Sequence, residues 1–335
     1  MKKIIALFLA LTLIFSVGAM VSCSDDEKDE TQLKIGFLNG PTGIGMAELI
    51  VNNGGLDGNE KYDFTKFDDT NEAAAALQAG KLDVVCLPTN EAAKIYNSAS
   101  VDVDVQVLAI NCLNSLYVVA KNDISINSFA DLEGKTVYTC KNGTPAIILN
   151  KLISEYGLNI TVKTEIGEGD SATVIAKPQD LPAVIVAGKA DIVIAPEPIV
   201  TNALLKTDNY SVKVDLGDVW DAKYSTPLAM GCVVARKDFV DAHKTVIDSF
   251  LADYENSIKF MSKEENLNTA SQYAVDTGIM AAVPAAKKAI SNLGDSIAYL
   301  DGQEMKESLE NVYKAFGMNV IGGKLPDEDF YYNVK

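Results

Sequence analysis

The sequence contains few of the residue types that most often perform catalysis or clamp an anion. It has one histidine, His243, and its only arginine is Arg236. A single histidine excludes a metal site built from several histidines, and nothing beside it in the sequence suggests a catalytic triad. There is also no GxSxG, no GxGxxG and no P-loop lysine pattern. These absences favour a binding protein over an enzyme, and no cofactor is expected.

Positive charge is scarce throughout the chain. Lysine and arginine together number 29, against 46 aspartates and glutamates, which gives the 335 residues a formal net charge of -17. Because no basic face is available to neutralise phosphates, nucleic acid is not expected as a partner. The length suits about two domains, and a hydrophobic content of 48% is enough to form sizeable cores.

The N-terminal residues have the pattern of an export signal. Lys2 and Lys3 precede an apolar run that is short for a membrane span, and residues 1–22 are therefore interpreted as a signal peptide. The run ends in "MVSCS", which resembles a bacterial lipobox, although Met20 replaces the usual leucine. We expect residues 23–32 to be a lipidated Cys23 and a flexible tether, so that the protein is exported and anchored at the cell membrane. An ordinary signal peptide with an incidental cysteine is the alternative.

Four further cysteines each lie in or beside an apolar run that predicts a strand. Buried thiols are the expected state. Export also permits oxidation in pairs, with three possible connectivities. The four residues are Cys86, Cys112, Cys140 and Cys232.

Short apolar strands alternate with helices over the first two thirds of the sequence, and helical spacing dominates the last third. This order predicts βαβ units and mostly parallel sheets, which is an α/β fold. Strands are expected at 33–39, 62–67, 82–88, 105–111, 134–140, 160–166, 190–196 and 210–216. Helices are expected at 44–53, 70–80, 90–97, 144–157, 181–188, 198–206, 245–263 and 302–317.

One stretch occurs twice. "AGKLDVVCLP" at 79–88 and "AGKADIVIAP" at 187–196 are identical at six of ten positions. In each copy we expect the glycine to cap a helix, a buried strand to follow, and the proline to end that strand. The repeat indicates two related α/β lobes, joined where the chain crosses at 114–121 and again at 227–237. Lobe 1 is expected to comprise 33–118 and 227–335, and lobe 2 to comprise 119–226.

Ligands of open α/β sheets bind beyond the carboxyl ends of the strands. The candidate binding residues are therefore those that follow strands or lie at the two crossings, although capping a helix or closing a turn is an alternative role for each. After the first strand of lobe 1 they are Asn39, Gly40, Pro41, Thr42 and Gly43, and in the equivalent place of lobe 2 they are Thr139, Asn142, Gly143 and Thr144. After the repeated strands they are Thr89, Asn90 and Glu197, and at the crossings they are Asn114, Ser115 and Met230.

Seven segments in this order resemble a known family over about 300 residues. They are "LNGPTGIG" (38–45), "AGKLDVVCLPTN" (79–90), "DLEGKTVY" (131–138), "NGTPAIILNKLI" (142–153), "AGKADIVIAPEP" (187–198), "PLAMGCVVARKDF" (227–239) and "IGGKLPDEDFYY" (321–332). The chain is similar to the extracytoplasmic substrate-binding proteins of ABC importers, in the group that binds sulfonate, nitrate and thiamine precursors.

The resemblance implies a type II periplasmic-binding-protein fold of two doubly wound lobes. It implies capture of a small molecule and its delivery to an ABC permease and ATPase subunits, and we expect a monomer. The family's cleft loops fall on 39–43, Thr89, Asn90, 142–144 and Glu197 of this sequence. Two other functions stay open: an enzyme of the same fold, similar to menaquinone- or pyrimidine-pathway enzymes, and a ligand-sensing lipoprotein without transport.

The class of ligand is only partly constrained. Amino-acid carboxylates are commonly clamped by arginine, and Arg236 lies beyond the second crossing, so an ordinary α-amino acid is not expected. An aromatic heterocycle and a small anion held by helix N-termini both remain possible. Tyr117, Tyr138 and Trp220 have rings that can stack on a heterocycle, but core packing is the expected role of each.

Overall fold

The computed structural model describes residues 29–99, 103–141 and 143–333. The expected signal peptide and Cys23 lie outside the described residues. A compact unit begins at Thr31 and contains all the helices and strands discussed below. No helix of the described residues is long and apolar enough to cross a membrane.

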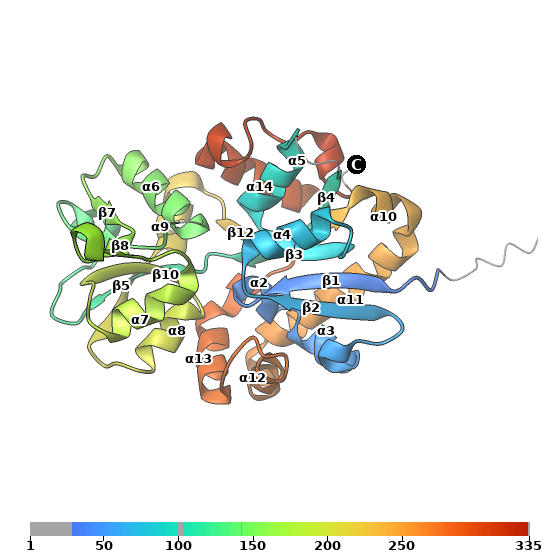
Figure 1. Ribbon diagram of the computed structural model, residues 1–335, viewed down its shortest axis with the longest axis horizontal. Helices are drawn as coiled ribbons and strands as arrows, with labels where there is room; N and C mark the ends of the chain where they lie inside the picture. Colours follow the sequence, from blue (N-terminus) through green and yellow to red (C-terminus); the bar gives the residue numbers. More distant parts are fainter. Residues whose placement is uncertain (1–28, 100–102, 142, 334–335) are drawn as a thin grey trace, which may run out of the picture. The chain divides into compact units, whose positions relative to one another are not determined.

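The first of two five-stranded sheets has the order β2-β1-β3-β12-β4 (Figure 1). Strands β2 and β3 pair in parallel with β1, whereas β12 is antiparallel to both of its neighbours, β3 and β4. Only β12 therefore runs against the rest of this sheet. The strands are Tyr62–Phe67 (β2), Leu33–Leu38 (β1), Val84–Pro88 (β3), Ala229–Arg236 (β12) and Val105–Leu113 (β4).

The second sheet repeats this plan in the order β7-β6-β10-β5-β11. Its strands β7 and β10 pair in parallel with β6, and β5 is antiparallel to both β10 and β11. The strands are Thr161–Lys163 (β7), Thr136–Tyr138 (β6), Ile192–Pro196 (β10), Leu116–Lys121 (β5) and Tyr210–Asp215 (β11).

The antiparallel strand of each sheet is the one that the chain enters from the other lobe. β5 follows β4 directly along the chain, and β12 follows β11 after one helix. The expected fold class of two α/β lobes joined by two crossings, with mostly parallel sheets, is confirmed.

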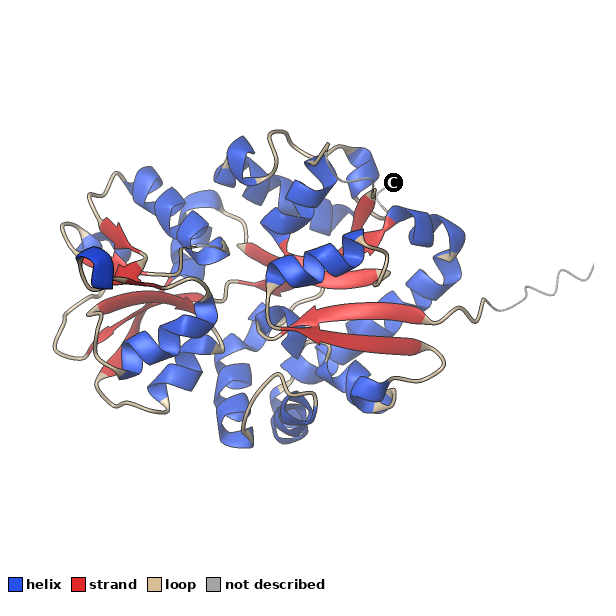
Figure 2. Ribbon diagram, viewed as in Figure 1, coloured by secondary structure: helices blue, strands red, loops and turns tan. Residues whose placement is uncertain are grey.

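Helices cover both faces of each sheet (Figure 2). In β3, Val85 and Leu87 share a core with α4 and α5, while Val84 and Cys86 face the core that holds α3 and α11. Side chains of a strand alternate between faces, so a strand buried on both sides is a continuous apolar run. These helices are Thr70–Gln78 (α4), Thr89–Asn97 (α5), Ala47–Asn52 (α3) and Lys244–Ser262 (α11). Three further helices of lobe 1 are Leu267–Asp276 (α12), Val283–Leu293 (α13) and Gly302–Phe316 (α14).

Strand β10 is buried in the same way in lobe 2. Val193 and Ala195 pack with α7 and α8, whereas Ile192 and Ile194 share a core with α6 and α9. The helices are Leu181–Val186 (α7), Ile199–Leu204 (α8), Thr144–Tyr156 (α6) and Leu216–Tyr224 (α9).

The helix end of the repeated stretch folds in the same way in its two copies. Gly80 and Gly188 both adopt left-handed backbone, with φ of 68° and 66°. The next residue in each copy closes the same helix end, since Lys81 N donates to Ala76 O at 3.0 Å and Lys189 N donates to Val184 O at 3.1 Å. The expected glycine caps are confirmed, because this geometry is strained for any residue with a Cβ.

The structure corrects two expected elements. The helix expected at 44–53 is two helices, Pro41–Ile44 (α2) and α3, separated around Gly45, a residue type with poor helix propensity. The strand expected at 160–166 divides into β7 and Glu165–Ile166 (β8), which pairs with Thr173–Val174 (β9) as a separate two-stranded sheet. Helix α9, which follows β11, was not expected.

The four expected buried cysteines are buried thiols. Their positions in or beside β3, β4, β6 and β12 place them in the apolar layers, so the oxidised alternative is not the state of this structure.

Candidate functional site

A cavity of about 290 Å³ lies where strand ends from both lobes meet. In lobe 1 its walls come from the ends of β1, β2 and β3 and from single residues of β4 and β12. In lobe 2 they come from the start of α6, the segment that leads into α7, and the end of β10. The lining residues are 38–42, 68–71, Pro88, Glu91, Cys112, Met230, 143–145, 176–179 and 196–199.

Eight of the candidate residues from the sequence line this cavity. They are Asn39, Gly40, Pro41, Thr42, Gly143, Thr144, Glu197 and Met230. Asn142 lies outside the described residues. The other six candidates do not line the cavity, and they are Gly43, Thr89, Asn90, Asn114, Ser115 and Thr139.

Several of those six stabilise the strand ends instead. Thr89 Oγ1 donates to Ala229 O at 3.0 Å, and Thr139 Oγ1 donates to Ile194 O at 3.2 Å. Each hydroxyl thereby ties a strand end to a neighbouring strand. Both side chains are fully buried, so neither is open to a ligand in this structure.

Other candidates shape the first crossing. Asn114 has a left-handed backbone (φ 36°), and its Oδ1 accepts from Leu228 N at 2.8 Å. This bond joins the segment between β4 and β5 to the residues just before β12, so Asn114 links the two crossings. Ser115 Oγ lies 3.3 Å from Met230 Sδ, beside the same junction.

Two candidate residues contact each other across the lobes. Thr144 Oγ1, at the start of α6, donates to Asn90 Oδ1 in α5 at 3.1 Å. Asn90 is fully buried and Thr144 is 5% exposed. The lobes therefore touch at the edge of the cavity through the residues that the sequence predicted to hold a ligand.

Glu197 is the buried acid of the cavity wall, with 1% of its surface exposed. Its Oε2 accepts from Thr201 N at 3.0 Å, and its Oε1 accepts from Thr201 Oγ1 at 2.9 Å and from Asn292 Nδ2 at 2.7 Å. Burial raises the pKa of Glu197, and these hydrogen bonds oppose the rise because they stabilise the charged form. Asn292 belongs to α13, which packs on the first sheet, so this contact also joins the lobes.

The sequence reasoning missed two parts of the wall. One is the segment after β2, where Asp69 caps α4 by accepting from Asn71 N at 2.8 Å and Glu72 N at 3.2 Å. The strand-end rule that selected Asn39 applies equally to this neighbouring parallel strand and would have found it. The other is the segment 176–179, which follows the very short strand β9 and has no comparable signal.

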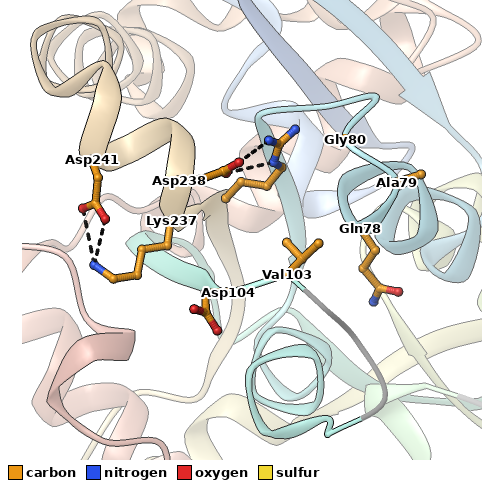
Figure 3. A pocket seen from close by; sticks show the side chains of 9 residues that line it. Gln78, Ala79, Gly80, Val103, Asp104, Lys237, Asp238 and Asp241 are labelled. Carbon is orange, nitrogen blue, oxygen red and sulfur yellow. Dashed lines mark hydrogen bonds and ion pairs between the residues drawn. The ribbon is translucent and has the colours of Figure 1, made fainter.

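A larger cavity of about 530 Å³ lies at the opposite end of the first sheet (Figure 3). Arg236 is bound there to Asp238, with Nε donating to Oδ1 at 3.0 Å and Nη2 to Oδ2 at 2.5 Å. Lys237 and Asp241 form a second pair, at 3.3 Å. Because its cations are already paired and it lies away from the strand ends that face lobe 2, we take the smaller cavity as the candidate site. Arg236 does not line that site.

The candidate site has groups suited to holding a molecule and few suited to reacting with it. Burial raises the pKa of the Cys112 thiol to about 11, so this thiol is protonated and weakly nucleophilic at neutral pH. No histidine lines the site, and no cluster of His, Cys, Asp or Glu among the described residues could hold a metal ion. The lining also contains four carboxylates and one lysine, together with neutral hydrogen-bonding groups and apolar side chains.

The rings that might have stacked on a heterocycle do not line the cavity. Trp220 is fully buried and packs edge-on against Phe316 of α14, with ring centroids 5.7 Å apart. Tyr117 is buried in the core of lobe 2, and Tyr138 packs against that core. The expected core role is what the structure shows for all three residues.

Comparisons with known proteins agree with this architecture. A family model described as menaquinone biosynthesis matches residues 50–315. No curated protein matches the chain.

Among solved structures, an ABC transporter from Parabacteroides distasonis is similar at 21% identity and a TM-score of 0.73, covering 90% of this chain and 99% of that one. The periplasmic aliphatic sulphonate binding protein of Escherichia coli is similar at 15% identity and a TM-score of 0.70, covering 91% and 93%. The periplasmic nitrate-binding protein of Synechocystis is similar at 13% identity and a TM-score of 0.60, covering 83% and 75%. At these identities the likeness shows the fold, and the expected type II periplasmic-binding-protein fold is confirmed.

Proposed function

The chain belongs to the family described as menaquinone biosynthesis, and from its fold and cavity we propose that it is the substrate-binding component of an ABC importer. The observation that carries this proposal is the cavity itself, which has one wall from each of two lobes joined by two crossings. Such a protein captures a small molecule between the lobes and delivers it to a membrane permease and its ATPase subunits.

Capture by two lobes requires an equilibrium between open and closed states that the ligand shifts towards closure. Trp220 of α9 packs on Phe316 of α14 across the lobes, and two side-chain hydrogen bonds join the lobes beside the cavity, Thr144 to Asn90 and Asn292 to Glu197. Each hydrogen bond is worth about 1 kcal/mol or a little more in net stability, so these bonds can break and re-form as the lobes move. The proposed ligand contacts are the eight candidate residues that line the cavity.

We retain the remaining sequence predictions as parts of this proposal. Lobe 1 comprises 33–118 and 227–335, and lobe 2 comprises 119–226. Residues 1–22 act as signal peptide, and Cys23 anchors an extracytoplasmic monomer to the membrane. The anchor keeps the binding protein beside its permease, which raises the local concentration of loaded protein.

An enzyme of the same architecture is the second candidate, and the family description favours it. It requires an acid, a base or a nucleophile at the cavity. Among the described residues, no recorded contact joins the protonated Cys112 thiol and the Glu197 carboxylate to one another or to a histidine, while Asp69 caps α4 and Glu91 pairs with Lys94. A ligand-sensing lipoprotein without transport remains a third function that uses the same cavity.

Native mass spectrometry of the chain from Ser24 onward, purified without denaturation, tests the binding function. We expect a protein peak heavier than the chain by the mass of one small molecule. The bound molecule should keep its mass after prolonged incubation with the protein. A molecule that is converted to a product of different mass would support the enzyme instead.

A further inference from the structure

The cavity wall is rich in carboxylates. Four acidic side chains line it and one lysine, Lys177, does so among the described residues; the acids are Asp68, Asp69, Glu91 and Glu197. Glu91 is neutralised from outside the cavity, because its Oε1 lies 2.7 Å from Lys94 Nζ. Asp68, Asp69 and Glu197 therefore leave the lining with more carboxylates than ammonium groups.

Glu197 is the carboxylate that water screens least, since it is 1% exposed. Both of its oxygens accept hydrogen bonds, an arrangement that suits the ionised form, and all of the donors are neutral groups. No ion pair recorded for the described residues includes Glu197. The charged group that acts on it from a neighbouring element is Lys288 of α13, which favours the carboxylate. Tyr117 of β5 is an ionisable neighbour that stays neutral, because burial raises the pKa of its phenol.

The groups that would attract an anion are weaker. Helix α6 begins at the cavity with Gly143 as an uncapped N-cap, and a helix N-terminus carries about half of an elementary positive charge. Helix α5 also begins at the cavity without a side-chain cap, at Pro88, whereas the free amides at the start of α4 are already occupied by Asp69. Arg236, the chain's only arginine, is bound to Asp238 in the other cavity.

We propose that the cavity selects a small organic cation, a molecule whose protonated amine or amidine lies against the carboxylates of Glu197 in lobe 2 and Asp68 in lobe 1. This inference rests on the proposed function and names the ligand class for it. The carbon skeleton has an apolar surface to pack on, since Leu38, Pro41, Ile199 and Met230 also line the cavity. A volume of about 290 Å³ is at the lower end for ligand pockets and limits the molecule to a small one.

The proposal separates this chain from two of the solved structures that it resembles, a sulphonate-binding protein and a nitrate-binding protein. An anion of that kind would have to enter a wall of excess negative charge on a chain with a net charge of -17. A cation would replace the missing positive partner of Glu197 and bridge the two lobes.

Three probes of matched shape and different charge test the inference: benzamidine, benzamide and benzoate. Calorimetric titration of the dialysed chain from Ser24 onward should give benzamidine at least tenfold tighter binding than benzoate, with benzamide between them. In Glu197→Gln this preference should shrink severalfold. In Asp191→Asn it should stay unchanged, because that variant removes the same charge at the other end of β10, at an exposed position outside the cavity.

Equal or tighter binding of benzoate would overturn the inference, as would a preference that Glu197→Gln leaves intact. The co-purified molecule from native mass spectrometry gives an independent answer. If that molecule is an anion, the binding function stands and the charge inference is wrong. If neither a co-purified molecule nor any of the three probes binds, the proposed function itself is wrong.

Discussion

The two copies of the repeated strand are alike as scaffold and differ where they end. β3 and β10 occupy the same place in sheets of the same order, are buried on both faces and follow left-handed glycine caps. After Pro88 the chain continues into Thr89 and Asn90, which are fully buried and hydrogen-bonded to protein. After Pro196 it continues into Glu197, a carboxylate on the cavity wall. The two lobes therefore share the buried strand and differ in the residue that follows it.

The aspartates of the two copies make the same point at the other end of the strand. Asp83 is 8% exposed, and its Oδ2 accepts from Lys34 N at 3.0 Å while its own amide donates to Lys34 O. Burial raises the pKa of Asp83. Asp191 is mostly exposed and forms a surface pair with Lys121 at 2.6 Å. The same residue at the same place of the repeat is therefore buried and structural in lobe 1 and exposed to solvent in lobe 2.

The largest expected effect comes from filling the cavity at the start of α6. Thr144→Trp places a large ring where the lobes meet and prevents closure over a ligand. We expect at least a hundredfold loss of affinity for benzamidine, or for the co-purified molecule, in a calorimetric titration. Thr144→Ser is the control, because it keeps the hydroxyl that donates to Asn90. Wild-type affinity in Thr144→Trp would remove this loop from the site.

A second change tests Glu197, the acid that follows the repeated strand in lobe 2 and has no counterpart after the strand in lobe 1. Glu197→Leu leaves Thr201 N, Thr201 Oγ1 and the Asn292 amide without their acceptor in a buried place. We expect the free energy of unfolding to fall by about 2 kcal/mol in urea denaturation. Glu197→Gln should lose less, because its side-chain oxygen still accepts one of these bonds. A loss as large in Glu197→Gln as in Glu197→Leu would contradict this account.

The same residue gives a pH dependence with a definite sign. Burial raises the pKa of Glu197 above its ordinary value of 4.5, so the folded state binds this proton more tightly than the unfolded chain. Between 4.5 and the raised value, the ligand-free protein should therefore lose stability as the pH rises, and Glu197→Gln should lack that contribution. Urea midpoints measured across this range for both proteins provide the check. Identical pH profiles would mean that Glu197 titrates normally.

The smallest expected effect separates the two aspartates. Asp83→Ala leaves Lys34 N without its acceptor, and we expect the free energy of unfolding to fall by about 1.5 kcal/mol. Asp191→Ala removes an exposed ion pair and should change it by less than about 0.5 kcal/mol. Thermal or urea unfolding of the two variants measures the difference. Equal losses would show that the two copies use this residue in the same way.

Most of the fold was predictable because it depends on local patterns. Alternating strands and helices, the glycine caps and the terminal prolines gave the two lobes and the mostly parallel sheets. The break near Gly45 was missed although the poor helix propensity of glycine is a local signal, and the small sheet of β8 and β9 was missed because its pairing depends on tertiary contacts. The candidate site was predictable from strand ends. Whether Asn90 contacts a ligand or instead contacts Thr144 depends on how the lobes meet, and no local sequence pattern encodes that contact.

The crystal structure of the natively purified chain with its bound molecule tests the central claim most directly. Our account predicts electron density for one small molecule that contacts both Thr42 of lobe 1 and Glu197 of lobe 2. Density beside Arg236 and Asp238 in the larger cavity, or density that touches only one lobe, would contradict it.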